Sequence, residues 1–184
     1  MPQLHIYPHQ QFPSHLNWQA VSFMRVEWPS ILLGGHRLGT ETYPAERDPI
    51  HFVITEQDML ISYAASMQLI LAHAGNIYSV AAFGNVFTFP AFRGEGYGRQ
   101  VVDAAVDFIQ TSTVDVGIVF CKSHLLAFYR ASGWEALDGA ETRVGTPSSF
   151  SNHPYHRLML FVSEHGKRAR SAFRQSPLYI DWPW

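Results

Sequence analysis

The chain has 184 residues, 47% hydrophobic and 15% charged, so it can bury a core and is too apolar to be disordered. A net charge of −2 without a long basic run gives no reason to expect a nucleic-acid partner. The single Cys121 excludes an internal disulfide, and neither the N-terminus nor the interrupted apolar stretch 59–92 predicts a signal peptide or membrane span. We therefore expect one cytoplasmic domain over 1–184.

The N-terminal half is predicted to hold one helix and a series of strands. Apolar residues at Leu16, Ala20 and Phe23 have helical spacing within 14–27, and the pattern stops before Pro29, which restricts the residue preceding it. The remaining segments are a loop at 34–48 with room for a helical turn, and strands at 4–7, 51–55, 60–73 and 77–89, the last two joined by a tight turn at Gly75-Asn76.

The C-terminal half alternates helices with strands. Apolar residues at Val102, Ala105, Val106 and Ile109 follow the i, i+3, i+4, i+7 pattern of an amphipathic helix over 98–110. The other expected elements are a buried strand at 116–121, a helix at 125–131 between an N-cap Ser123 and a closing Gly133, loop-rich chain at 135–157, an outer strand at 158–162 and a solvated turn at 167–170. This order predicts an α+β fold, with a mostly antiparallel mixed sheet flanked by helices.

A glycine-rich segment joins the strand ending near Thr88 to the amphipathic helix. Its glycines, Gly94, Gly96 and Gly98, let the backbone approach a ligand closely. The helix start adds unpaired N–H donors and the positive end of the helix dipole, so the loop is suited to a pyrophosphate. Two alternatives stay open: a turn without a ligand, and a dinucleotide site, although the spacing is not G-x-G-x-x-G.

Two motifs give this loop a family context. The arrangement Arg-x-x-Gly-x-Gly at Arg93 to Gly98 resembles the coenzyme A signature of the GNAT N-acetyltransferases. About thirty residues later, the run from Ala127 to Trp134 (AFYRASGW) resembles the second signature of that family. The resemblance implies a GNAT fold in which splayed strands hold acetyl-CoA as the acetyl donor.

The resemblance also implies roles for particular residues. Tyr129 would protonate the departing coenzyme A thiolate, which suits a phenol that is neutral at working pH; the alternative is a core aromatic. The residues expected to bind the cofactor are Val86, Phe87, Thr88, Arg93, Gly94, Glu95, Gly96, Tyr97, Gly98, Arg99 and Ser123.

No general base is evident from the sequence. Many members of the family carry a carboxylate in the strand before the glycine loop, but residues 82–88 contain none. Asp181, Glu41 and the C-terminal carboxylate are candidates, and solvent is another. Cys121 precedes a helix, so an acyl-cysteine route is an alternative to a small buried residue.

The last eight residues, PLYIDWPW, are unusually aromatic for a terminus. Asp181 and the Trp184 carboxylate would attract a cationic acceptor, so residues 165–184 are expected to line the acceptor site; the alternative is simple tethering of the terminus. The tail and the segment YAAS at 63–66 resemble the aminoglycoside 2′-N-acetyltransferases, although the strand carboxylate of that group is missing and the tail is shorter.

The sequence thus predicts direct transfer of acetyl from acetyl-CoA to a primary amine of a small molecule, one candidate being an aminoglycoside 2′-amine. Alternatives are another small amine, a peptide N-terminus, or a non-catalytic acyl-CoA sensor. A homodimer formed through the tail or residues 145–156 is left open. The ten scattered histidines, including His153 and His156, predict no metal site.

Overall fold

The fold is described from a computed structural model, which covers residues 1–32, 37–182 and 184. The chain forms two compact units, Met1–Met67 with Asn85–Ala105 and Gln68–Gly84 with Val106–Trp184. The expected loop at 34–48 falls partly outside the described residues. The part that follows contains one helical turn, η4 (Ala45–Arg47).

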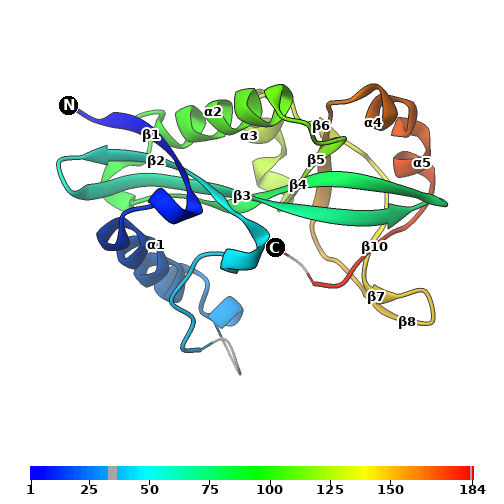
Figure 1. Ribbon diagram of the computed structural model, residues 1–184, viewed down its shortest axis with the longest axis horizontal. Helices are drawn as coiled ribbons and strands as arrows, with labels where there is room; N and C mark the ends of the chain where they lie inside the picture. Colours follow the sequence, from blue (N-terminus) through cyan, green and yellow to red (C-terminus); the bar gives the residue numbers. More distant parts are fainter. Residues whose placement is uncertain (33–36, 183) are drawn as a thin grey trace. The chain divides into compact units, whose positions relative to one another are not determined.

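The first unit contains strands and a helix close to those expected. Helix α1 spans Ser14–Glu27, and strand β1 spans Gln3–Pro8. Strand β2 (Ile50–Glu56) pairs antiparallel with β1 on one side and with β3 (Met59–His73) on the other. The buried residues of α1 are Leu16, Ala20, Val21 and Met24, and the helix lies along one face of the strands of this unit (Figure 1).

Strand β3, strand β4 (Asn76–Thr88) and helix α2 (Tyr97–Thr111) contribute to both units. The turn before β4 lies one residue earlier than expected, because Ala74 (φ 47°) and Gly75 (φ 79°) occupy it. Two consecutive left-handed residues are typical of a type I′ hairpin. The remaining short helices are η1 (His9–Gln11), η2 (Pro29–Leu32), η5 (Pro90–Phe92) and η6 (Ser123–Leu125).

Seven strands form a mixed sheet in the order β1-β2-β3-β4-β5-β9-β6. Strand β4 is parallel to β5 (Val116–Cys121), and β5 is antiparallel to β9 (His156–Phe161). The expectation that 158–162 is an outer strand is wrong, because β9 also pairs with β6 (Glu135–Ala136) on its other side. The continuous apolar run of β5 agrees with its burial on both faces.

The expectation of loop-rich chain between 135 and 157 is also wrong. A second sheet has the order β10-β7-β8, formed by β7 (Thr142–Thr146), β8 (Ser149–Asn152) and β10 (Leu178–Ile180). Strand β8 (SFSN) is exposed along its whole length, and its four residues are too few and too polar to show a strand pattern. Strand β10 pairs parallel with β7, which ties the tail to the second unit.

Residues 167–170 are helical rather than a solvated turn. Lys167 and Arg168 end α4 (Glu164–Arg168), Arg170 begins α5 (Arg170–Gln175), and Ala169 links the two helices. The Ser163 hydroxyl accepts the Gly166 N–H at 3.0 Å and so caps α4, while Ala169 and Phe173 are buried in the core of this unit. None of the helices in the described part of the chain has both the length and the apolar character that crossing a bilayer requires.

A further correction concerns Ser123. The helix expected at 125–131 is α3 (Leu126–Arg130), preceded by η6, and the Ser123 side chain caps neither of them. Its hydroxyl instead lies 2.9 Å from Nε2 of His156 at the start of β9. Gly133, with φ 89°, does adopt the left-handed conformation expected after the helix.

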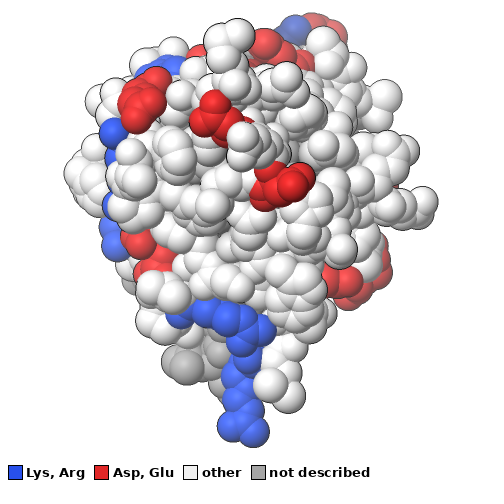
Figure 2. All heavy atoms as spheres, turned by 90° about the vertical axis from the view of Figure 1, so that its left-hand side faces the viewer, with Lys and Arg blue, Asp and Glu red and all other residues white. Residues whose placement is uncertain are grey.

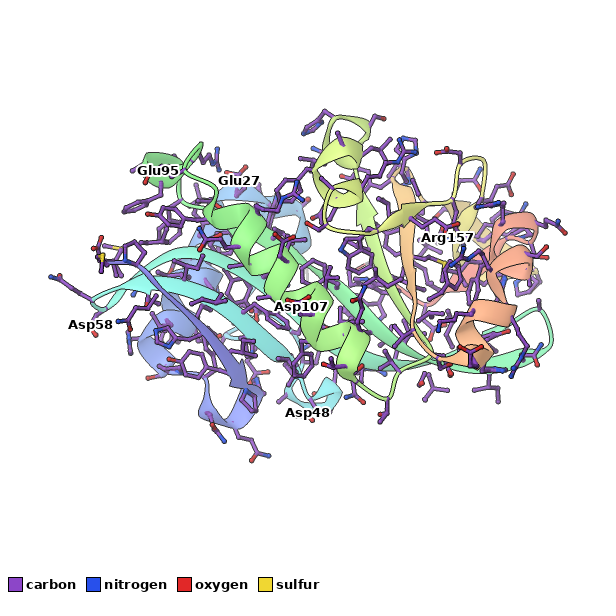
Figure 3. The ribbon with its side chains drawn as sticks, turned by 90° about the horizontal axis from the view of Figure 1, so that it is seen from above. Glu27, Asp48, Asp58, Glu95, Asp107 and Arg157 are labelled. Atoms are coloured by element: carbon purple, nitrogen blue, oxygen red, sulfur yellow. The ribbon has the colours of Figure 1, made fainter. Side chains whose placement is uncertain are left out.

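Arg157 is a buried cation in the core of the second unit (Figure 3). Its guanidinium donates to the carbonyl of Phe173 at 2.6 Å and to the carbonyl of Glu141 at 3.2 Å. Burial lowers its pKa to about 10. Arg157 therefore ties β9 to α5 and to the segment before β7 through backbone acceptors.

Asp115, just before β5, is the polar centre of the same unit. Its carboxylate accepts the backbone N–H and hydroxyl of Ser79 at 2.9 and 3.1 Å and the hydroxyl of Ser163 at 2.6 Å. Burial acts to raise the pKa of Asp115, but the bonds from Ser163 and Ser79 and the charge of His165 lower it overall. The carboxylate thus joins β4, β5 and the start of α4.

We expect Asp115→Asn to lower the free energy of unfolding at pH 7 by about 2 kcal/mol, because hydrogen bonds to a charged acceptor are lost. The folded pKa of Asp115 is depressed, so its contribution is present above its unfolded value, about 3.9, and is lost as the pH falls through the folded pKa. Urea unfolding at pH 7 and pH 3 measures the difference. A stability gap that does not narrow in acid would contradict this role.

Candidate functional site

Strand β4 departs from regular pairing just before its end. Its ladder with β5 ends at Phe83 and Val119, although β4 continues to Thr88. The backbone groups on this edge of residues 85–88 are therefore not used by the β5 ladder. Asn85 has φ 53°, a left-handed conformation that asparagine tolerates better than most residues, and its side chain donates to the Thr42 carbonyl at 3.0 Å.

The last residues of β4, predicted to align the acetyl group, are held from β3. The Ser62 hydroxyl donates to the Phe87 carbonyl at 2.9 Å and lies 2.8 Å from the Thr88 hydroxyl. The Phe89 N–H donates to the Ile61 carbonyl at 2.9 Å. The Phe87 ring is buried, while Val86 is half-buried. This strand end is a preformed backbone edge.

The glycine-rich loop follows and opens helix α2. Gly94 and Gly96 have φ of 88° and 85°, and the first helical hydrogen bond runs from the Gln100 N–H to the Gly96 carbonyl at 3.1 Å. A helix has no carbonyl to offer to its earliest N–H groups, here beginning with Tyr97 and Gly98. Figure 3 shows Glu95 on this loop beside the start of α2.

Arg93 has a different position from the other loop residues. Its backbone N–H donates to the Pro90 carbonyl at 3.3 Å. Its side chain donates from Nε to the Thr88 carbonyl at 3.0 Å and reaches the Glu27 carboxylate at 3.7 Å. Arg93 therefore fastens the loop to the strand end and to α1, and the amides available to a ligand come after it.

The loop fits a coenzyme A pyrophosphate. No atom lies within 4 Å of the position a Cβ would take at Gly94 or Gly96, so a ligand can approach the backbone there. The N-terminus of the 15-residue helix α2 adds the positive end of the helix dipole. On the face in Figure 2, the Asp and Glu side chains are dispersed over uncharged surface.

We expect Gly96→Ala to weaken coenzyme A binding about tenfold, because an L side chain at φ 85° strains the loop backbone by about 1 kcal/mol or more. Gly139→Ala is the matched control, since Gly139 also has a positive φ (77°) and open space at its Cβ position, but lies outside the loop. Titration calorimetry with coenzyme A measures both affinities. Equal losses of affinity in the two variants would argue against binding at the loop.

Tyr129 lies on α3 in the second unit and is 5% exposed. Burial, and then the neighbouring Cys121, raise the pKa of its hydroxyl, which therefore stays protonated at neutral pH. Its ring meets Phe128 and Trp134 edge-on, at centroid distances of 5.1 and 6.5 Å. Tyr129 is buried like a core aromatic and also keeps its hydroxyl proton. Its burial therefore fits both of its interpretations, as a general acid and as a core aromatic.

Cys121 is buried at the end of β5, which agrees with its interpretation as a small buried residue. Burial raises the pKa of its thiol to about 11, with Arg130 acting weakly in the other direction. A thiol with such a pKa is almost entirely protonated at pH 7, so it is a poor nucleophile. The environment therefore gives no support to an acyl-cysteine route.

The tail residues lie in the second unit. Asp181 is exposed, just after β10. Trp184 is half-buried, and its ring lies 5.1 Å from Phe120 and 6.5 Å from Trp182. Among residues 1–32, 37–182 and 184, no group of three His, Cys, Asp or Glu side chains is arranged to hold a metal ion.

Comparison with known families decides the identity of the fold. The family model described as an acetyltransferase (GNAT) domain matches residues 10–137, well over half of the chain. The chain belongs to the GNAT acetyltransferases. It is therefore an acyl-CoA-dependent N-acetyltransferase, with acetyl-CoA as the donor.

Solved structures agree with this GNAT fold. Escherichia coli ElaA superposes with a TM-score of 0.61 at 16% identity, over 86% of this chain and 99% of its own. An acyl-CoA N-acyltransferase from Pseudomonas aeruginosa superposes with a TM-score of 0.58 at 15% sequence identity, over 86% of this chain and 99% of its own. No match was found among curated protein sequences.

The GNAT signatures pointed to the loop and to Tyr129, but not to the polar residues around Asn85. A hydrogen-bonded series of side chains reaches the bend in β4 at Asn85, where φ is positive. It consists of Thr42, Tyr63, His51 and His9. They come from separate segments of the sequence, so no local motif marks them. The one available signal was Gly84-Asn85, because an isolated glycine within a strand pattern often indicates a bulge.

Proposed function

We propose that the protein acetylates the primary amine of a small molecule by direct attack of that amine on acetyl-CoA. The observation that carries the proposal is the end of β4, where residues 86–88 form a preformed backbone edge leading into a glycine loop and the N-terminus of α2. An exposed backbone edge can orient a thioester, and the loop can hold the pyrophosphate.

Acetyl-CoA supplies the activated acetyl group and a thiolate leaving group. The backbone of Val86, Phe87 and Thr88 would orient the donor at the strand edge. Amides from Gly94 to Arg99 would bind its phosphates, with Arg93 holding the loop in place, and Ser123 would add a polar contact. This assignment uses backbone donors for affinity and leaves the side chains free to vary.

Tyr129 would hold the proton that the thiolate requires. Its raised pKa keeps the phenol protonated at working pH, and a thiolate is basic enough to take the proton as it departs. General acid catalysis by a positioned side chain contributes about 10²- to 10⁴-fold in rate, so this residue is expected to affect kcat strongly.

The finer proposal for the acceptor is an aminoglycoside 2′-amine. Its support is the resemblance of the tail to that group, together with the exposed Asp181 and the aromatic pair Trp182 and Trp184. A carboxylate attracts an ammonium group, and aromatic faces attract cations. Another small amine or a peptide N-terminus is the alternative, and on this proposal the tail lines the acceptor site in either case.

A non-catalytic acyl-CoA sensor is the rival from another class. The absence of a carboxylate from residues 82–88 favours it, and the GNAT signature around Tyr129 opposes it.

The test is release of free thiol from acetyl-CoA in the presence of aminoglycosides with and without a 2′-amine, polyamines, amino acids and short peptides. Release that requires the 2′-amine supports the aminoglycoside proposal. If thiol is released only with other amines, the proposal of direct acetyl transfer stands and the aminoglycoside acceptor is rejected. Coenzyme A binding with no release for any amine supports the sensor.

A further inference from the structure

A continuous series of polar side chains runs through the first unit from the bend in β4 to the surface. The Thr42 hydroxyl lies 2.6 Å from the Tyr63 hydroxyl, which lies 2.8 Å from Nδ1 of His51. Nε2 of His51 lies 3.3 Å from Nδ1 of His9. Nε2 of His9 then lies 3.9 Å from the Glu41 carboxylate.

Burial is greatest in the middle of this series and is lowest at the Glu41 end. Tyr63 and His51 are 0% and 1% exposed, and Thr42 is 7% exposed. The side chains of His9 and Glu41, at the other end, are 22% and 45% exposed. The series therefore connects a dry interior to solvent, and it needs no ordered water to do so.

One set of proton positions satisfies every link in the same direction. Thr42 donates to the Tyr63 oxygen, and Tyr63 donates to Nδ1 of His51, which must therefore carry its proton on Nε2. That Nε2–H donates to Nδ1 of His9, whose own Nε2–H faces Glu41. All donors then point outward, which is the arrangement that a proton relay requires.

The environment keeps the interior members neutral. Burial, and then the nearby His9, lower the pKa of His51 to about 3, while burial raises the pKa of Tyr63. The ring of Phe12 stacks on His51 at 4.1 Å and excludes water from that face. His51 is therefore neutral at pH 7 and does not keep an extra proton, but it can accept a proton on one ring nitrogen while it donates the proton of the other.

The inner end of the series is at the strand edge assigned to acetyl transfer. The backbone carbonyl of Thr42 accepts the Asn85 side chain at 3.0 Å. The Tyr63 ring stacks on Phe87 at 5.3 Å. Thr42 therefore contacts β4 at Asn85, just before residues 86–88, and Tyr63 contacts β4 at Phe87, within them.

We propose that Thr42, Tyr63, His51 and His9 form the proton-exit path for the acceptor amine, replacing the carboxylate that residues 82–88 lack. As the new C–N bond forms and the C–S bond breaks, the amine loses one proton to the Thr42 oxygen. Each member passes on its own proton, and His9 releases one to Glu41 or water. The inference rests on the proposed direct attack, which supplies the proton.

Two substitutions break the relay with little change of shape. Thr42→Val and Tyr63→Phe each remove one hydroxyl, and each should lower kcat about tenfold or more, with coenzyme A affinity unchanged. Thr42→Ser keeps the hydroxyl and should restore most of the rate. Tyr7→Phe is the control for Tyr63, because Tyr7 pairs with His51 across β1 and β2 and its ring contacts Phe12, yet it lies outside the relay.

The measurements are kcat and KM for the best amine, its pH profile, coenzyme A titration and thermal melting. A lower kcat for Thr42→Val with a parental melting temperature, rescued by Thr42→Ser, supports the relay. Parental kcat in both Thr42→Val and Tyr63→Phe overturns the relay while the proposed function stands. If the parent acetylates no amine in the panel, the proposed function is wrong and the relay is overturned with it.

A readout independent of turnover is the tautomer of the imidazoles, from ¹⁵N-correlated NMR of the parent protein. The relay requires the proton of neutral His51 on Nε2 and Nδ1 as the acceptor. A proton on Nδ1 of His51 would reverse the bond with Tyr63 and overturn the proposal.

Discussion

Tyr129→Phe is expected to lower kcat by about 10²- to 10³-fold while leaving the affinity for coenzyme A unchanged. The substitution removes only the hydroxyl, whose raised pKa keeps it protonated at neutral pH, so the thiolate must then leave without a positioned acid. The ring is retained, which preserves its edge contacts with Phe128 and Trp134. Steady-state kinetics of thiol release and calorimetric titration with coenzyme A measure the two quantities.

Tyr78→Phe is the control for this experiment. Tyr78 is also a buried tyrosine of the second unit, 2% exposed, and packs on Phe173 away from the GNAT signatures. Its loss of a hydroxyl should change kcat by less than about twofold, because the residue has no role in proton transfer. If Tyr129→Phe retains the parental kcat, Tyr129 is a core aromatic and solvent supplies the proton.

Gly166→Ala should lower the free energy of unfolding by about 2–4 kcal/mol, the upper range for overpacking. A Cβ at Gly166 would overlap the carbonyl oxygen of Asp115 and lie 2.9 Å from its carbonyl carbon. Both are backbone atoms. That carbonyl also accepts the N–H groups of Val162 and Ser163, at 2.9 and 3.3 Å, so it has little freedom to move.

Gly117→Ala is the comparison for Gly166. Its Cβ would meet Ile109 and Leu160 at 3.3 Å, and a shift of a few tenths of an ångström relieves such contacts, in contrast to the overlap at Gly166. Gly117→Ala should lower the free energy of unfolding by about 1 kcal/mol or less. Urea unfolding of both variants at pH 7 measures the difference. Equal stability losses in the two variants would show that α4 moves to accept the methyl group.

Several elements were predictable because one local pattern determined each of them. Helix α1 occupies Ser14–Glu27, as its apolar spacing and Pro29 predicted. Strand β5 occupies Val116–Cys121, since a continuous apolar run suits a strand covered on both faces. The buried residues of α2 include all four that define its periodicity, Val102, Ala105, Val106 and Ile109.

Other elements had no local signal. Strand β8 consists of exposed residues, three of them polar, and its existence depends on backbone pairing with β7. Helix α4 is short and highly charged, and it depends on the Ser163 cap and on close packing of Gly166 against Asp115. Patterns that follow one segment at a time cannot detect stabilisation that comes from a distant partner.

The candidate site shows the same division. The glycine loop and Tyr129 were predictable because both belong to contiguous signatures of the GNAT family. The anchoring of Arg93 to Thr88 and Glu27 was not predictable, because it joins a loop to a strand end and to a helix far away in the sequence. The same holds for the contacts of Ser123, whose sequence position indicated a helix cap but whose hydroxyl meets His156.

By itself, the sequence indicated the acetyl-CoA donor and the GNAT fold through its two signatures, and it indicated the glycine loop proposed for the phosphates, because these signatures and the glycine spacing are local properties of the chain. Only the tertiary structure decided which polar groups reach the bend in β4. Thr42, Tyr63, His51 and His9 meet because the antiparallel pairing of β1, β2 and β3 and the loops beside them bring separate segments together. Hydrogen bonds between such segments depend on strand register, which no stretch of sequence specifies alone.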